Sequence, residues 1–155
     1  MSRLATFVAS LVVASAAFAH HGWSSYDEKA PIYLAGTVQS VGWQNPHAEL
    51  VVSPEVQSLP PGLATRVVPA QEQPVDGPTV LANTTLAADL SGTWTVELAP
   101  LTRMDAWGVA RIQAGAKVEL VGFTFPKGGS TERRMRVEFL FVDGQAYSIR
   151  SMPKR

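Results

Sequence analysis

The chain contains no cysteine among its 155 residues. This absence excludes disulfide bonds, catalysis by a thiol and metal sites built from thiolates. A folded domain of this sequence must therefore be stabilised by its hydrophobic core. Any metal ion must be bound by nitrogen or oxygen ligands.

An excess of either charge is also absent, because 13 Lys and Arg residues stand against 13 Asp and Glu residues. Domains that bind nucleic acids commonly carry a clustered basic surface. The balance therefore argues against a nucleic acid as partner.

The sequence lacks the motifs of the common enzyme classes. It has no Gly-rich phosphate loop, no Gly-x-Ser-x-Gly turn and no carboxylate pair spaced for acid–base catalysis. Ser24 and Ser25 follow His20 and His21, but no residue is placed to orient one of these histidines as a base. We therefore expect a protein that is not an enzyme.

Long hydrophobic runs are absent except at the start of the chain. Residues 2–19 contain the positive Arg3, an apolar run from Leu4 to Ala16, and the small-x-small sequence Ala17-Phe18-Ala19. This pattern predicts a signal peptide, residues 1–19, that is cleaved near Ala19. A transmembrane helix would need about 20 apolar residues. We expect a secreted or periplasmic mature protein of 136 residues without a membrane span, in which 12 Lys and Arg face 13 Asp and Glu.

The remaining sequence is typical of an all-β domain. Hydrophobic alternation and turn residues predict strands at 33–43, 47–52, 93–98, 117–123, 135–142 and 146–150. The segment 100–112 has helical spacing, with Gly108 as a plausible stop. A helix between the third and fourth strands predicts a small OB-fold-like barrel of five strands, spanning 35–150 after an N-terminal segment, 20–34. An immunoglobulin-like sandwich would need about seven strands and no such helix.

Residues 53–92 interrupt this pattern. They are rich in Pro, Gly and small polar residues and show no sustained period. We expect a mobile insertion between two strands, with 65–68 as a possible short strand.

Four stretches resemble the DUF6152 family of exported bacterial proteins: AHHGWSSYD, LAGTVQSVGWQNPHAEL, WTVELAP and IQAGAKVELVGF. The most specific part is Gly36-Thr37-Val38 followed by Trp43 to His47. The resemblance implies export and this fold. It implies no activity, since the function of the family is unknown. The long insertion departs from the family, which more often has a short turn there.

The three histidines, His20, His21 and His47, lie at the predicted mature terminus or on the first hairpin. Cleavage after Ala19 would give His20 a free α-amine, which has a pKa of about 7.7–8.0 and chelates a metal together with the imidazole. A second imidazole, from His47 or His21, would complete three nitrogen ligands, which suit Cu(II). Cleavage after Ala17 would instead make His20 the third residue of the mature chain, and a histidine at the third position also chelates Cu(II). Alternatively, His47 only caps a turn or packs beside Trp43.

A ligand cleft is the other candidate site. Trp43, Asn45 and Trp94 could line it, although tryptophans more often fill the core of a barrel, and Glu97 faces away from the apolar side of its strand. Three functions follow. A copper-binding protein that uses His20 and His47 is favoured over a non-enzymatic OB-like module that binds a protein or small molecule without metal. A copper enzyme with a terminal histidine brace ranks last.

Overall fold

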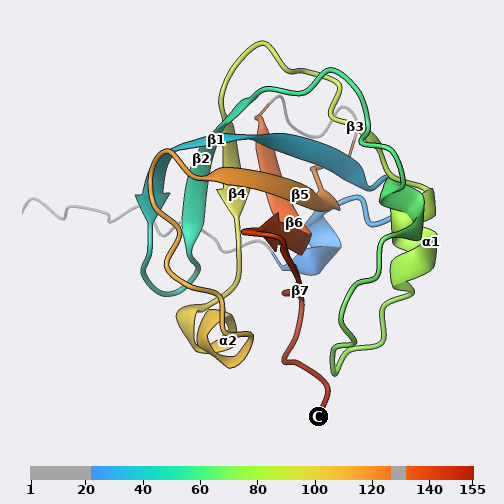
Figure 1. Cartoon of the computed structure of the whole chain (residues 1–155), viewed down its shortest axis with the longest axis vertical. Helices are drawn as coiled ribbons and strands as arrows, with labels where there is room; N and C mark the ends of the chain where they lie inside the picture. The colour runs from blue at the N-terminus through green and yellow to red at the C-terminus, as the bar shows by residue number, and fades with distance from the viewer. Residues whose placement is uncertain (1–21, 127–131) are drawn as a thin grey trace, which may run out of the picture.

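The computed structural model describes residues 22–126 and 132–155. Its centre is a closed barrel, in which the hydrogen-bonded order is β1-β2-β4-β6-β5 and β5 returns to β1. Strands β4 and β6 are parallel, and the other neighbours in the barrel are antiparallel. The barrel strands are β1 (Ile32–Gly42), β2 (Glu49–Pro54), β4 (Trp94–Glu97), β5 (Lys117–Phe123) and β6 (Arg134–Val142). The predicted small all-β barrel is confirmed (Figure 1).

Short elements surround the barrel. A β-hairpin through Asp143 and Gly144, both at positive φ, adds β7 (Gln145–Ser148) beside β6, as the Asp-Gly pair predicts. Helix α2 (Leu101–Ala106) lies between the third and fourth barrel strands. It ends two residues before Gly108, whose φ of 68° is left-handed, so the predicted stop is confirmed.

Alternation along the strands builds the main core inside the barrel. On β4, Trp94 and Val96 point inward and are 5% and 0% exposed. Met104 of α2 is 0% exposed and belongs to the same core, since the helix covers one end of the barrel. Because the neighbours Thr95 and Glu97 point to the opposite face of β4, they are displayed on the outside of the barrel.

Strand β1 bends strongly so that it can pair with both β2 and β5. Its register with β2 shifts between Val38 and Ser40, which is a β-bulge. At Gly36 the β2 backbone approaches so closely that a Cβ atom would overlap the carbonyl oxygen of Ser53. The absence of a side chain at Gly36 therefore permits this close approach of the two strands.

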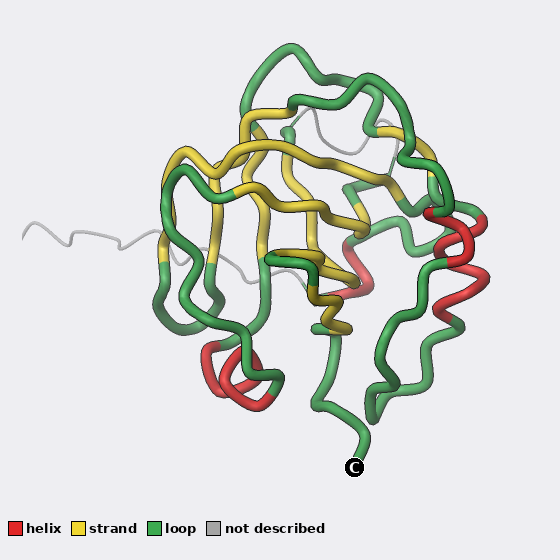
Figure 2. Tube along the Cα trace, viewed as in Figure 1, coloured by secondary structure: helices red, strands yellow, loops and turns green. Residues whose placement is uncertain are grey.

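The insertion 53–92 contains regular structure, although its sequence shows no sustained period. It contains η2 (Leu63–Thr65), α1 (Gly77–Ala82) and β3 (Thr85–Leu86), and Asp76 caps α1 through the backbone N–H of Thr79. The short strand predicted at 65–68 is wrong, because Thr65 ends η2 and the next residues are irregular. Figure 2 shows α1 outside the barrel strands.

A second, smaller core joins the insertion to the outside of the barrel. Leu63 and Leu81 of the insertion pack with Tyr33, Val121 and Phe139 of β1, β5 and β6. These barrel residues face away from the main core, and the insertion covers them. The mobility of the insertion stays a prediction.

The N-terminal part of the described chain contains η1 (Trp23–Ser25) and leads into β1. Within residues 22–126 and 132–155, no helix has the length and apolar character needed to cross a bilayer.

Candidate functional site

Glu97 lies at the end of β4 and gathers polar side chains on the outside of the barrel. Its Oε1 is 3.3 Å from Nδ1 of His47 and 3.5 Å from a guanidinium nitrogen of Arg136. Its Oε2 accepts a hydrogen bond of 3.3 Å from the hydroxyl of Tyr26 and is 3.8 Å from Arg134. We call these five residues the Glu97 cluster.

The register of the barrel explains this gathering. Glu97 pairs with Glu49 of β2 on one side and with Arg136 of β6 on the other. Residues that pair across neighbouring strands project from the same face. Two carboxylates and a guanidinium therefore form one row outside the barrel, and Arg134 adds an ion pair of 3.0 Å to Glu49.

The cluster is shielded from solvent, and Glu97 is only 9% exposed. Burial, followed by the negative charge of Glu97, raises the pKa of Tyr26 to about 12, although Arg136 and Arg134 act in the opposite direction. The Tyr26 hydroxyl thus remains a proton donor to Glu97 at neutral pH.

Trp23 joins the N-terminal segment to this cluster. The guanidinium carbon of Arg136 lies 4.6 Å from the centre of the Trp23 ring, and that of Arg150 lies 3.9 Å from it. Phe123 meets the same ring edge to face at 6.2 Å. Two cation–π contacts and an aromatic pair therefore fix the chain to the barrel directly after residue 22.

A buried ion pair lies behind Trp23. Glu138 of β6 is 0% exposed and accepts hydrogen bonds from Arg150 and from Gln71 of the insertion. Arg150 also pairs with Glu28 at 2.7 Å. Burial raises the pKa of Glu138, although the charge of Arg150 opposes that change. This network connects the barrel, the insertion and the N-terminal segment.

The predicted metal ligands are only partly within the described chain. His47 belongs to the Glu97 cluster and its side chain is 17% exposed, whereas His20 and His21 lie outside the described residues. In the part of the chain that the structure describes, no group of three His, Asp or Glu residues is arranged to hold a metal ion. Of the three predicted ligands, the described residues include His47, which lies beside the carboxylate of Glu97.

The predicted ligand cleft is not assembled from its four residues. Trp94 is buried in the core and donates its indole N–H to the carbonyl oxygen of Asp89, so it does not line a cleft. Asn45 accepts a hydrogen bond from the backbone N–H of Leu101 and so caps α2. Trp43 packs against the edge of the main core, and Glu97 belongs to its own cluster.

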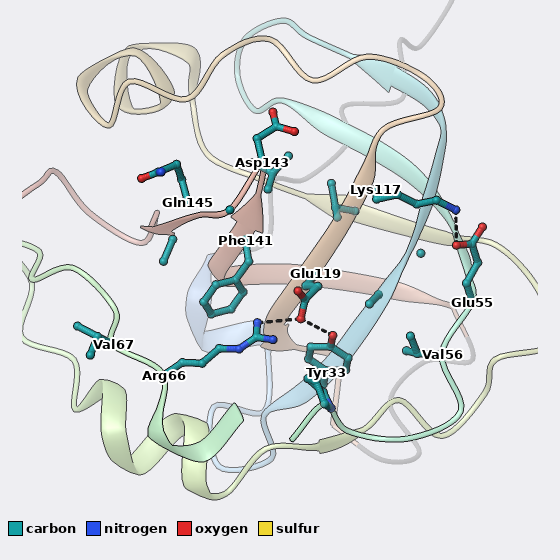
Figure 3. Close-up of a pocket in the computed structure, with 17 residues that line it drawn as sticks. Tyr33, Glu55, Val56, Arg66, Val67, Lys117, Glu119, Phe141, Asp143 and Gln145 are labelled. Atoms are coloured by element: carbon teal, nitrogen blue, oxygen red, sulfur yellow. Dashed lines mark hydrogen bonds and ion pairs between the residues drawn. The ribbon is translucent and has the colours of Figure 1, made fainter. Parts of the chain in front are cut away.

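A cavity of about 710 Å³ lies elsewhere, between the insertion and the outer faces of β1, β5, β6 and β7. On its floor, Glu119 of β5 accepts a hydrogen bond of 2.6 Å from Tyr33 and forms an ion pair of 2.7 Å with Arg66 (Figure 3). Arg66 also stacks over the ring of Phe141 at 4.8 Å. Burial raises the pKa of Tyr33, so its hydroxyl stays a donor. We call this space the insertion cavity.

The insertion cavity was not predicted from the sequence. Arg66 lies in the Pro-rich segment, which has no period, and Glu119 and Phe141 are ordinary outward positions of their strands. No local signal could have shown that the insertion folds back over these strands.

Comparison with known proteins supports one relationship. Residues 8–58 match the DUF6152 family model. The predicted resemblance to DUF6152, a family of unknown function, is thereby confirmed over these residues. No curated protein and no solved structure matches the chain.

The DUF6152 match includes only part of each site. It contains His47 of the Glu97 cluster and Glu55 at the rim of the insertion cavity. Glu97, Arg66 and Glu119 lie beyond it. The DUF6152 match therefore assigns no activity, and the function must be argued from the residues.

Proposed function

We propose that this DUF6152 protein is exported, begins at His20 after cleavage behind Ala19, and binds one Cu(II) ion. The α-amine and imidazole of His20 and the imidazole of His47 are the ligands, and His21 supports them. The observation that carries the proposal is the attachment of Trp23 beside the Glu97 cluster.

The attachment of Trp23 limits how far His20 can lie from His47. Three contacts lead from the Trp23 ring to His47, through Arg136 at 4.6 Å, then Glu97 at 3.5 Å, then the imidazole at 3.3 Å. His20 is three residues before Trp23, a length that spans at most about 10 Å. This length is similar to the sum of the three contacts, which supports one site shared by a terminal chelate and the His47 imidazole.

The pairing of His47 with Glu97 also favours this role. A histidine that binds a metal commonly has its other ring nitrogen on a carboxylate, which fixes the orientation of the ring. Here Nδ1 faces Glu97, an arrangement that suits binding through Nε2. Because Arg134 and Arg136 both contact Glu97, we assign this carboxylate to orienting His47 and not to the metal itself.

Copper fits this donor set better than zinc. Nitrogen sites follow an affinity order with Cu(II) at its head, and three nitrogens in one plane suit its tetragonal geometry. Structural zinc sites more often use thiolates, which this chain lacks.

The first experiment establishes where the exported protein begins and how it binds Cu(II). Intact mass is expected to show a chain that starts at His20. Titration against a competing chelator is expected to give one site, and electron paramagnetic resonance is expected to show three coordinating nitrogens. A chain that starts at Phe18 would overturn the assignment of His20.

Three variants separate this site from an unassisted terminal chelate. His47→Ala should weaken Cu(II) binding at least tenfold, whereas Gln44→Ala, an exposed change in the same loop, should leave it unchanged. Trp23→Ala should also weaken binding while both proposed ligands remain. An affinity that is indifferent to His47 would refute the proposal.

A further inference from the structure

The insertion cavity has the size of a small-molecule site. Its volume of about 710 Å³ lies within the range of about 300–1,000 Å³ that ligand pockets have. Its floor is the paired row Ala35, Glu119, Phe141 and Ala146, taken from four neighbouring strands. Its opposite wall is the insertion, which comes from a different part of the chain.

Both cations of the cavity already contact carboxylates. Arg66 pairs with Glu119 on the floor, and Lys117 pairs with Glu55 at the rim, as the dashed lines in Figure 3 show. The positive charge of each cation is therefore already balanced by a carboxylate.

The remaining charged side chain of the cavity lining is Asp143. It lines the cavity from the β6–β7 turn and is exposed, and no cation among residues 22–126 and 132–155 forms an ion pair with it. The cavity thus carries three carboxylates against two cations. Its unbalanced charge is negative, and it lies on the side of the turn (Figure 3).

The lining also contains large apolar side chains. They include Val56 and Val67 of the insertion and the ring of Phe141. Val67 is 88% exposed. A ligand that touched this ring and the β6–β7 turn would cover apolar surface and place a positive charge near Asp143.

We infer that the insertion cavity binds a small organic cation, an amine joined to an apolar body. The apolar body lies between Phe141 and the valines of the insertion, and the ammonium group faces Asp143. This site is separate from the Glu97 cluster, and it does not depend on the proposed copper site.

Three probes with the same six-carbon chain test this assignment in the full mature protein. Hexylammonium, hexanol and hexanoate carry a cationic, a neutral and an anionic head group, and each is titrated while backbone amide shifts are followed by NMR. Hexylammonium is expected to cause saturable shifts at 143–146 and in the insertion, and to bind more tightly than hexanol. Hexanoate is expected to bind most weakly. Hexanoate binding as tight as that of the amine, or no saturable shift at 143–146, would overturn the inference.

A charge-only variant completes the test. Asp143 has a φ of 52°, and Asn tolerates this left-handed conformation, so Asp143→Asn should keep the turn. It should weaken hexylammonium about fivefold, the effect of one unit charge about 4 Å away in water, and leave hexanol unchanged. The matched control is Asp105→Asn, an exposed change on α2 that lies outside the cavity lining. An equal loss in both variants would mean that only net charge matters and would contradict the site.

Discussion

Arg150 donates a hydrogen bond from Nε to the carboxylate of Glu138, whose side chain is completely buried in β6. The pair lies under Trp23 and contacts Gln71 of the insertion. A barrel strand, the segment after β7, the insertion and the N-terminal segment therefore meet at one ion pair. The stability of the fold should therefore depend on Arg150 and Glu138 together.

The first prediction concerns that dependence. Arg150→Met should destabilise the fold by about 3–5 kcal/mol, because it leaves the Glu138 carboxylate buried without its cation. Adding Glu138→Gln should recover much of that loss, since the amide carries no charge. Urea unfolding measures both values.

The exposed Arg111 provides the control for this pair. Arg111→Met should change the free energy of unfolding by less than about 0.5 kcal/mol. A double variant as unstable as Arg150→Met alone would show that the buried charge is not the cause.

The second prediction concerns the close approach of β1 to β2. Gly36→Ala should destabilise the fold by about 1–3 kcal/mol or more, because the new Cβ would displace the β2 backbone at Ser53. Gly42→Ala, in the same strand, meets only ordinary contacts at 3.8 Å and should be close to neutral. The melting temperatures of the two variants test this prediction, and an equal loss of stability in both would contradict it.

The third prediction concerns the insertion. Leu81→Ala should cost about 2–5 kcal/mol, because Leu81 is 2% exposed in the core between the insertion and the barrel. Leu59→Ala, at a position that is 39% exposed, should change the free energy of unfolding by less than about 0.5 kcal/mol. If Leu81→Ala were as mild as Leu59→Ala, the insertion would not contribute to the cooperative fold.

The fourth prediction is a pH dependence at Asp89. Hydrogen bonds from the side chain and backbone of Ser91, followed by one from Arg133, lower the pKa of Asp89 from 3.8 to about 2. Because the pKa of Asp89 is lower in the folded state, the ionised carboxylate stabilises the fold at pH values above the pKa that Asp89 has in the unfolded chain. This contribution is lost as the pH falls from about 4 to about 2.

Two variants check this sign. The stability difference between the wild type and Asp89→Asn should be constant above pH 5 and should shrink toward pH 2. Ser91→Ala should move the pKa of Asp89 back toward 3.8, as measured by carboxyl NMR. A difference that grew toward acid pH would contradict the assigned cause.

Much of the barrel could be predicted because its signals are local. Alternation on β4 placed Trp94 inside and Glu97 outside, and the Asp143-Gly144 pair located the last hairpin. Gly108 marked the end of the helix that follows β4. Each of these signals depends on a few neighbouring residues and on the period of a strand or helix.

The insertion could not be predicted in the same way. Its helix α1 is only six residues long, and its apolar residues are too widely spaced to show a period. They are buried only because barrel residues such as Tyr33 and Phe139 provide an apolar surface for them. Short elements of this kind depend on tertiary packing more than on their own propensity.

The sequence by itself determined the absence of thiol chemistry, the barrel with its helix, and the outward position of Glu97. Only the tertiary structure decided which side chains meet Glu97, and that Arg66 closes a cavity over Glu119 and Phe141. The physical reason is separation along the chain. A strand's period fixes which face a residue occupies, but the groups that cover that face come from segments whose position depends on the packing of the whole molecule.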